Sequence, residues 1–286
     1  MPRTYAQALA AAQTLGLDRL DAQLLLLHAL GKSPDDRAWL LAHDTDALDD
    51  GIAPQFDALA QRRAAGEPLA YIVGYKEFFG LRFGVDPRVL IPRPDTETLV
   101  NWSLELLQTG ALPANAAILD LGTGSGAIAL ALAHAMKSAG RPVHVTATDA
   151  SCDALAVARD NASRLQLDVA FIESSWFEQV GGLFHLIASN PPYVADSDPH
   201  LADLAHEPRG ALTAGPDGLD DIRQIIDQAP EHLHAGGWLL LEHGYDQAPA
   251  ARELLAQRGF VQVQSRLDLP GIERCSGGQW PGLIAP

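Results

Sequence analysis

The chain has 286 residues, 47% of them hydrophobic, which is enough for one large or two modest domains with a buried core. Its 20 Lys and Arg residues stand against 36 Asp and Glu residues, so the formal net charge at pH 7 is -16. Such an acidic chain repels phosphate backbones, which argues against a protein that binds nucleic acid along its length.

Side chains that form disulfides or bind metals are sparse or unfavourably spaced. The 2 cysteines, Cys152 and Cys275, form no CxxC motif, and the 10 histidines show no HExxH or similar ligand spacing. We therefore expect no metal site and a reduced, cytoplasmic protein. The N-terminus does not read as a signal peptide and the apolar runs are too short to span a bilayer, so no membrane partner is expected.

The first part of the chain has helical patterning. Residues 4–75 show apolar residues at helical spacing, interrupted by the turn-forming stretches GKSPDD and DTDALDDGIAP, and contain no credible strand. This pattern predicts a small helical domain over residues 1–75.

A segment with strand-like composition follows. Aromatic and β-branched residues, with glycines between them, become frequent over residues 69–92. This composition predicts a hairpin that connects two domains, with residues 76–92 as the linker itself. We expect Phe78 and Phe79 in this hairpin to pack between the domains.

A helix should follow the hairpin. The stretch PRPDTE places Pro94 before the first turn, and Asp95 is a plausible N-cap for a helix that runs through LVNWSLELL. We expect Thr96 and Glu97 to act as capping residues of the same helix.

From residue 116 onward, strand and helix patterns alternate. The strand patterns AAILDL, VHVTAT, VAFIES, FHLIAS, WLLLE and FVQVQSRL are interspersed with helix patterns such as AIALALAHAM and SCDALAVARDNASRL. Alternating strands and helices form crossover units. They predict an α/β domain over residues 93–286, with a mostly parallel sheet and helices on both faces.

The first of these strands leads directly into DLGTGSGAIAL, a glycine-rich turn that opens a helix. Gly122, Gly124 and Gly126 let the backbone approach a ligand, and the helix N-terminus offers free N–H groups. The second strand ends in Asp149, whose carboxylate can accept hydrogen bonds from a ribose diol. A nucleoside cofactor is predicted, but the glycines do not separate NAD from S-adenosylmethionine, and a turn without a ligand is the remaining alternative. Asp120, ahead of the glycines, suits a methionine ammonium better than a pyrophosphate.

The fourth strand pattern ends in SNPPY. Two consecutive prolines cannot continue a sheet ladder, so the strand stops in a stiff turn on the sheet edge that carries the glycine loop. This suits methyl transfer to a planar amide or amino nitrogen, because the Asn190 side-chain oxygen and the Pro191 carbonyl can each accept one N–H proton as positive charge develops. Pro192 stiffens the turn, and the Tyr193 ring can stack on a flat substrate group. A rigid loop without a chemical role is the alternative.

With these motifs in place, the chain resembles the release factor glutamine N5-methyltransferases, a family within the Rossmann-like S-adenosylmethionine-dependent methyltransferases. The resemblance extends over nearly the full length, and NPPY with RPDTE upstream is its most specific pairing. The matching stretches are DAQLLLLHAL, EPLAYIVGYKEFFG, LIPRPDTETLV, DLGTGSGAIAL, ATDAS, NPPY and EPRGALTAGPDGL.

The resemblance implies a function and a set of site residues. It implies methyl transfer from S-adenosylmethionine to the side-chain amide nitrogen, N5, of the GGQ glutamine in class I peptide chain release factors. Asn190 and Pro191 would be catalytic, and the whole NPPY stretch from Asn190 to Tyr193 would hold the glutamine. Trp176, which on its own could equally be a core aromatic, would contact adenine. The implied cofactor-binding residues are Gly122, Thr123, Gly124, Ser125, Gly126, Asp149, Trp176 and Asn190.

Substrate choice is less constrained by the sequence. A lone glutamine side chain is too small to give specificity, so we expect the helical domain over residues 1–75 to recognise the protein substrate. Glutamine methylation of a ribosomal protein and adenine-N6 methylation of a nucleic acid remain alternatives. So does a chain of another class, either an NAD-dependent oxidoreductase or a nucleotide-binding module without catalysis. The net charge argues against the nucleic acid, and the last alternative leaves NPPY unexplained.

The sequence assigns no role to two further residues, Gln279 and Glu242. The tail IERCSGGQWPG contains a GGQ of its own, with Gln279 where the family usually shows arginine. We expect this GGQ to be a coincidence rather than a site of self-methylation, because its context predicts a strand and not an exposed loop tip. Glu242 ends the strand pattern WLLLE, at the same sheet edge as the glycine loop.

Overall fold

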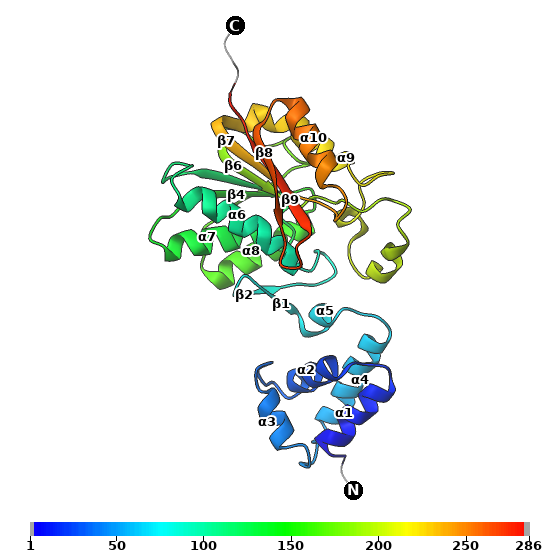
Figure 1. Ribbon diagram of the computed structural model, residues 1–286. Coiled ribbons are helices and arrows are strands. Elements are labelled where there is room, and N and C mark those ends of the chain that lie inside the picture. The colour runs from blue at the N-terminus through cyan, green and yellow to red at the C-terminus, as the bar shows by residue number, and fades with distance from the viewer. Residues whose placement is uncertain (1–2, 283–286) are drawn as a thin grey trace. The chain divides into compact units, whose positions relative to one another are not determined.

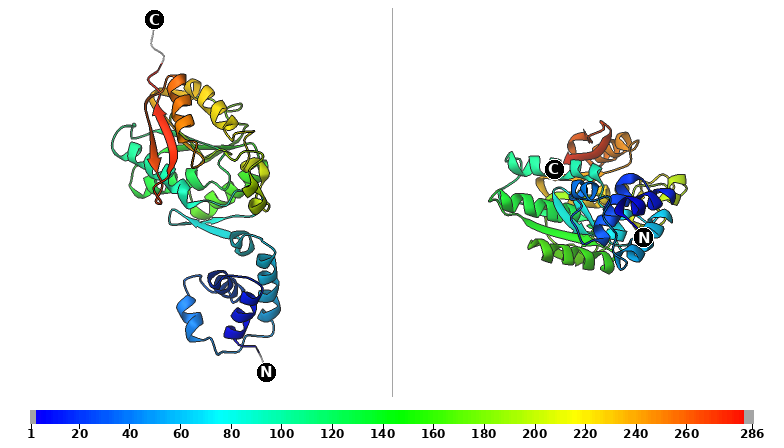
Figure 2. Two further views of the ribbon diagram at one scale, coloured as in Figure 1. Left: turned by 45° about the vertical axis from the view of Figure 1, so that its right-hand side comes forward. Right: turned by 90° about the horizontal axis from the view of Figure 1, so that it is seen from below.

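The computed structural model describes residues 3–282. The chain divides into two compact units, the first ending at Tyr75 and the second beginning at Lys76 (Figures 1 and 2). Each unit contains buried hydrophobic clusters of its own.

The first unit is a set of short helices around an aliphatic and aromatic core. Thr4 and Asp18 accept hydrogen bonds from backbone N–H groups in the first turns of α1 and α2, which fixes where these helices begin. Leu25, Leu26 and Phe56 are completely buried in the core between them. The helices are α1 (Tyr5–Thr14), α2 (Arg19–Ala29), α3 (Arg37–Ala42), α4 (Ile52–Ala64) and α5 (Leu69–Val73).

The last helix of this unit corrects the predicted hairpin. Residues 69–73 were expected to be extended because of their aromatic and β-branched content, but they form the helix α5. Pro68 precedes its first turn, and Gly74 ends it in the left-handed conformation with φ 80°. Tyr71 and Ile72 are buried in the helix, so tertiary packing overrides the local strand preference.

The hairpin itself is shorter than predicted. It pairs β1 (Tyr75–Phe78) with β2 (Leu81–Gly84) in a two-stranded sheet. The two turn residues Phe79 and Gly80 have φ values of 52° and 71°, as a tight turn between twisted strands requires.

The hairpin aromatics do not pack where we expected. Phe78 is 2% exposed and belongs, with Phe83 and Leu99, to a core cluster made only of second-unit residues. Phe79 packs against the same cluster. Their burial therefore anchors the hairpin to the second unit rather than filling a space between domains.

The helix after the hairpin begins differently from the prediction. A short 3-10 turn, η1 (Pro94–Thr96), leads into α6 (Glu97–Gln108), and no side chain caps α6. Asp95 instead lies 3.5 Å from the Arg274 guanidinium. Glu97 accepts a hydrogen bond from the Phe79 N–H at 3.0 Å. The expected capping roles of Asp95, Thr96 and Glu97 were therefore wrong, because each side chain has a partner distant in the sequence.

The second unit is built on a seven-stranded sheet with the order β5-β4-β3-β6-β7-β9-β8. The pairs from β5 to β7 are parallel, and β9 runs antiparallel to both β7 and β8. This confirms the predicted α/β class with a mostly parallel sheet. The strands are β3 (Ala117–Leu121), β4 (His144–Asp149), β5 (Ala170–Glu173), β6 (Phe184–Ser189), β7 (Leu233–Glu242), β8 (Val261–Leu267) and β9 (Glu273–Gln279).

Helices cover both faces of this sheet (Figure 1). Successive strand residues point to opposite faces, so Ile118 packs in one core cluster with residues of α6 and α7, whereas Leu119 packs in the other with residues of α9 and α10. The chain order reverses around β3, which lies between β4 and β6, and such a reversal opens a crevice at the carboxyl ends of the strands. The helices are α7 (Ala127–Ser138), α8 (Cys152–Leu165), α9 (Asp220–Gln228) and α10 (Ala248–Arg258), with 3-10 turns η2 (Pro199–Leu204), η3 (Arg209–Ala211) and η4 (Ala229–His232).

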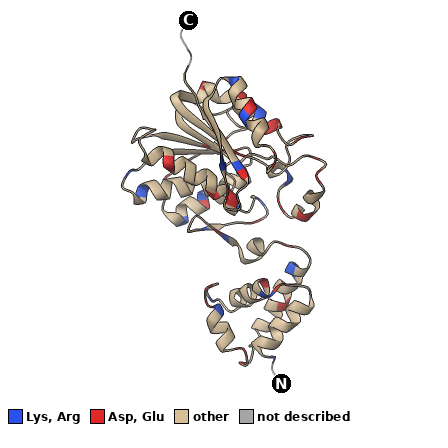
Figure 3. Cartoon of the chain, in the orientation of Figure 1, with Lys and Arg blue, Asp and Glu red and all other residues tan. Residues whose placement is uncertain are grey.

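Charged residues are distributed over both units. Figure 3 shows Lys and Arg interspersed with Asp and Glu along the described ribbon, rather than gathered into one basic stripe.

Candidate active site

The glycine loop follows β3 directly. Gly122, Gly124 and Gly126 have φ values of 70°, 53° and 85°, a region that side-chain-bearing residues rarely adopt. The Thr123 N–H bonds to the carbonyl of Thr148 on the neighbouring strand at 2.8 Å, which ties the loop to the sheet. The sequence therefore places glycine where the backbone must turn sharply ahead of α7.

A buried carboxyl group stabilises this loop through hydrogen bonds. Asp120 is 0% exposed, and its Oδ2 accepts hydrogen bonds from the Thr123 hydroxyl at 2.6 Å and the Ala129 N–H at 3.1 Å. Its Oδ1 has no partner among the described residues. Burial raises the pKa of Asp120 to about 7, against the opposing effect of these two hydrogen bonds. In this conformation Asp120 supports the loop and does not line the pocket described below.

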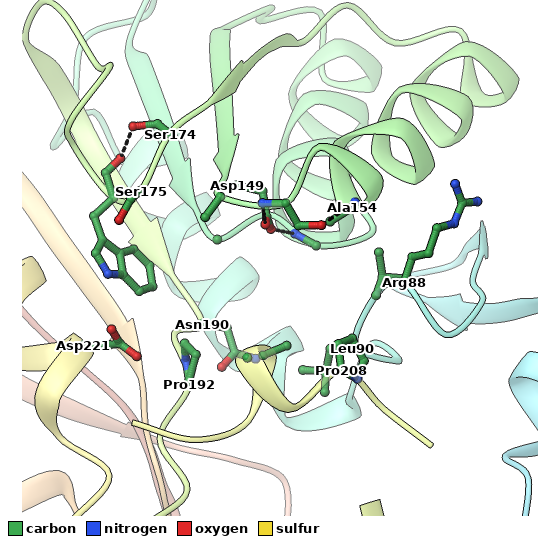
Figure 4. Close-up of a pocket in the computed structure, with 18 residues that line it drawn as sticks. Arg88, Leu90, Asp149, Ala154, Ser174, Ser175, Asn190, Pro192, Pro208 and Asp221 are labelled. Carbon is green, nitrogen blue, oxygen red and sulfur yellow. Dashed lines mark hydrogen bonds between the residues drawn. The ribbon is translucent and has the colours of Figure 1, made fainter. Parts of the chain in front are cut away.

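Asp149 ends β4 beside the loop. Its Oδ2 accepts a hydrogen bond from the Gly124 N–H and its Oδ1 one from the Ser151 N–H, both at 2.9 Å. Burial raises the pKa of the Asp149 carboxyl, and these backbone hydrogen bonds lower it. The carboxylate thus fixes the glycine loop while facing the pocket (Figure 4).

A pocket of about 410 Å³ opens at this edge of the sheet, within the usual size range of small-molecule sites. Of the predicted site residues, Gly122, Gly124, Asp149, Trp176, Asn190 and Pro192 line it. An adjoining hollow of about 50 Å³ is lined by Thr123 and Ser125, and it shares Asn190 with the pocket. Gly126, Pro191 and Tyr193 line neither.

Trp176 is one of the residues that line the pocket. Its ring lies 3.4 Å from the position that a Cβ atom on Gly122 would occupy, so it faces the glycine loop. Its backbone has φ 47°, and the Ser174 hydroxyl donates a hydrogen bond to its carbonyl at 3.0 Å. Asp221 of α9 also lines the pocket, and a hydrogen bond with the Trp176 side chain lowers its burial-raised pKa. The indole is thus held at the pocket surface rather than within the core.

The NPPY segment leaves β6 next to the glycine loop. The Ser189 hydroxyl donates to the Leu121 carbonyl at 2.7 Å, which ties the end of β6 to the end of β3. Asn190 donates through Nδ2 to the Thr96 hydroxyl at 3.2 Å. Among the described residues, none donates a hydrogen bond to the Asn190 Oδ1. The amide nitrogen therefore has a protein partner, the oxygen has none among the described residues, and Asn190 lines the pocket.

Backbone hydrogen bonds to a second loop hold the NPPY turn in place. The N–H groups of Tyr193 and Val194 donate to the Leu212 carbonyl at 3.2 and 2.8 Å. Gln247 donates through Nε2 to the Tyr193 carbonyl at 3.0 Å. The segment EPRGALTAGPDGL, which contains Leu212 and Gly218, therefore positions the turn.

Substituting Gly218 by alanine should displace this turn. A Cβ atom at Gly218 would lie 2.2 Å from the Tyr193 carbonyl oxygen, and the residue has φ 72°. We expect G218A to lower the free energy of unfolding by about 2 kcal/mol or more and to slow the reaction of this site, because the Tyr193 backbone must move.

Urea unfolding and steady-state kinetics measure both effects. The matched control is Gly181→Ala, where the described structure has no atom within 4 Å of the added Cβ and φ is not positive. Equal stabilities for G218A and G181A would contradict the proposed support of the turn.

The sequence analysis did not predict the contacts of several residues in this region. Thr96 contacts Asn190 although it was expected only to cap a helix. Glu207 accepts a hydrogen bond from the Ile91 N–H at 3.1 Å and forms an ion pair with Arg93, which joins the chain on both sides of the pocket. The occurrence of RPDTE together with NPPY was the one sequence signal for the contact between Thr96 and Asn190, since it suggested that the two segments act together.

The tail GGQ is part of the sheet. Gln279 ends β9 opposite Trp238, whereas Cys275 lies opposite Glu242 at the carboxyl end of β7. The Gln279 Nε2 donates to the Gly236 carbonyl at 3.0 Å, and its Oε1 accepts from Gln262 at 2.7 Å. The amide that self-methylation requires is therefore engaged, at the end of the strand away from the pocket.

Residues 3–282 contain no group of three or more His, Cys, Asp or Glu side chains arranged to hold a metal ion. Over the same residues, no helix is both long and apolar enough to cross a bilayer.

Comparison with known proteins identifies relatives for both units. Residues 3–74 match the family model of the PrmC N-terminal domain, and residues 102–263 match that of the methyltransferase small domain. A protein from Bordetella pertussis named release factor glutamine methyltransferase is 51% identical over 92% of this chain and 95% of its own length. One of the same name from Burkholderia pseudomallei is 49% identical over 98% of both chains.

The fold has solved counterparts. The crystal structure of a methyltransferase from Pyrococcus furiosus matches with a TM-score of 0.52 and 21% identity, over 80% of this chain and 98% of that one. At this identity the likeness shows the shared fold alone.

Proposed function

This chain belongs to the release factor glutamine methyltransferase family, and from that premise we propose the reaction that its pocket performs. It transfers a methyl group from S-adenosylmethionine to the side-chain amide nitrogen, N5, of the GGQ glutamine in class I peptide chain release factors. The observation that carries this proposal is that Asn190 lines the pocket while only its amide nitrogen, held by Thr96, has a hydrogen-bond partner among the described residues.

The residues around the pocket fit the proposed cofactor. Gly122 and Gly124 leave room for close approach, Asp149 offers a carboxylate for a ribose diol, and Trp176 offers a flat surface for adenine. Thr123 and Ser125 line the adjoining hollow, and Gly126 starts the helix behind it. When bound, S-adenosylmethionine supplies an electrophilic methyl group next to a sulfonium.

Asn190 and Pro191 act on the nitrogen that receives the methyl group. An amide nitrogen is a poor nucleophile because its lone pair is delocalised, and positive charge grows on it as the new N–C bond forms and the S–C bond breaks. Acceptors aimed at its two N–H protons stabilise that charge in the transition state more than in the ground state. We assign this role to the Asn190 oxygen and the Pro191 carbonyl. The methylated amide then loses one proton to water, so no strong base is needed.

Pro192 and Tyr193 shape the remainder of the glutamine site. Pro192 lines the pocket, and the preceding Pro191 is buried, so the turn has little freedom to move. The Tyr193 ring is half-buried, and we propose that it packs against the flat amide of the substrate.

The helical unit is the proposed site of substrate recognition. It matches a family model of its own over residues 3–74, and a single glutamine side chain offers little binding energy. We propose that residues 1–75 recognise the release factor, that residues 76–92 connect them to the methyltransferase domain over residues 93–286, and that the protein works in the cytoplasm.

Deleting residues 1–70 tests whether the helical unit recognises the release factor. We expect the truncated chain to lose its preference for an intact release factor over a short GGQ peptide, because the peptide needs only the pocket. The ratio of kcat/KM values for the two substrates measures this preference. An unchanged ratio would refute a recognition role for the helical unit.

Methyl incorporation into a release factor, its GGQ variant, duplex DNA and a ribosomal protein tests the function itself. Labelled methyl from S-adenosylmethionine should enter a purified class I release factor but neither the same factor with its GGQ glutamine changed to alanine nor duplex DNA. Label in DNA would favour adenine methylation. Label in a ribosomal protein, with none in any release factor, would favour the ribosomal alternative.

A further inference from the structure

A loop between the NPPY turn and α9 contributes to the pocket. We call residues 195–211 the pocket loop, and its residues Pro208 and Ala211 line the pocket. The two ends of the loop are held together, because the Val194 N–H donates to the Leu212 carbonyl at 2.8 Å. Between these ends lie the 3-10 turns η2 and η3, which contain no buried residue. Little apolar packing therefore holds the pocket loop in place.

The anchor of the pocket loop is a glutamate. Among residues 195–211, Glu207 alone is buried, and 3% of its side chain is exposed. Its carboxylate accepts a hydrogen bond from the Ile91 N–H at 3.1 Å and forms an ion pair with Arg93. The Arg93 side chain is 33% exposed, so water reaches this pair from one side. A carboxylate is costly to bury without such partners, so the position of the loop depends on these polar contacts.

The segment that binds Glu207 is fixed to the second unit. Val89 and Ile91 are buried there. Pro92 and Pro94 stand on either side of Arg93 and restrict the backbone at that point. Of the two segments that meet at Glu207, the pocket loop is therefore the one with freedom to move.

The contacts of Glu207 lie directly beside the pocket. Leu90 precedes Ile91 in the chain, Pro208 follows Glu207, and both Leu90 and Pro208 line the pocket. Figure 4 shows these two lining residues next to each other on one side of the pocket. The hydrogen bond and the ion pair of Glu207 thus join the two segments where they enclose it.

We propose that Glu207 is a positioning residue that holds the pocket loop closed over the bound cofactor, acting through Ile91 and Arg93. While these contacts are made, the cofactor is enclosed and leaves slowly. When they break, water solvates both charges again and offsets much of the lost ion pair, so the loop opens reversibly. The cofactor and its demethylated product, S-adenosylhomocysteine, exchange in the open state. The identity of this ligand rests on the proposed function.

Stopped-flow measurement of S-adenosylhomocysteine binding tests the proposal. E207A removes both contacts and should raise the dissociation rate constant by about 10- to 100-fold, whereas the association rate constant should change by less than about threefold, because the ligand enters the open pocket in either protein. E207Q keeps an oxygen acceptor for the Ile91 N–H but loses the charge, so its dissociation rate constant should lie between those of the wild type and E207A. D203N, which changes an exposed carboxyl group of the same loop, is the control.

The two rate constants separate a closing role from a merely structural one. If Glu207 only shaped the pocket, E207A would bind S-adenosylhomocysteine more slowly and release it at the wild-type rate. That result, or a wild-type dissociation rate constant in E207A, would overturn the proposal.

Hydrogen–deuterium exchange without any ligand separates this proposal from the function itself. At a temperature at which all variants are folded, the backbone amides of residues 195–211 should exchange faster in E207A than in the wild type or D203N. Equal exchange in E207A and the wild type would overturn the closing role even if methylation of a release factor were confirmed. If the wild type methylates no release factor, the proposed function fails, while the exchange rates still decide whether Glu207 holds the loop.

Discussion

Replacing Asn190 with alanine will lower kcat for methyl transfer to a release factor by about 100- to 1000-fold, the usual effect of removing one preorganised group that stabilises transition-state charge. The variant removes the acceptor at the pocket and leaves the Thr96 hydroxyl without its donor. The cofactor pocket otherwise keeps its glycine loop, Asp149 and Trp176, so the KM for S-adenosylmethionine should change far less than kcat.

Single-turnover methylation measures this loss directly. The control is Asn101→Ala, which removes an exposed amide on α6. If N190A retained a tenth or more of the wild-type rate, the clamp would not be the source of catalysis, and the mechanism given above would have to be abandoned.

Replacing Asp149 with alanine will raise the Kd for S-adenosylmethionine by about 10- to 100-fold, which corresponds to the loss of hydrogen bonds made by a charged group. Two effects add up in this variant. The proposed acceptor for the ribose hydroxyls is removed, and the Gly124 and Ser151 N–H groups lose the carboxylate that holds the loop in shape.

Calorimetric titration of the free enzyme with S-adenosylmethionine tests this effect without any protein substrate. Asp149→Asn keeps one oxygen acceptor for the loop and should lose less affinity than D149A. Asp160→Ala, at an exposed position of α8, should bind the cofactor as the wild type does. Wild-type affinity in D149A would exclude Asp149 from the cofactor site.

Local sequence patterns were sufficient to predict the alternating strands and helices of the second unit. The strand–glycine–helix sequence around Gly122 and the strand end at Asp149 predicted neighbouring parallel strands, and β3 and β4 are indeed paired. NPPY was expected on the same edge, and Asn190 lines the pocket together with both. Parallel topology explains this success, because it brings every carboxyl strand end to one edge. The roles of these residues in binding and catalysis stay predictions.

Contacts between distant segments explain the errors. Residues 69–73 have strand-forming side chains, yet the burial of Tyr71 and Ile72 in a helix decided their conformation. Thr96 is a residue type that is common at helix caps. Its hydroxyl instead accepts a hydrogen bond from Asn190, 94 residues further along the chain. A sequence window that contains only one of two partners gives no sign of such a contact.

Site-resolved mass spectrometry of a class I release factor tests the central claim most directly. The factor is incubated with S-adenosylmethionine and either the wild-type chain or N190A, then digested, and the fragment with the GGQ motif is sequenced in the instrument. The account predicts one methyl group on the side chain of the GGQ glutamine with the wild type and almost none with N190A. Methylation at another residue, or equal methylation by both proteins, would contradict it.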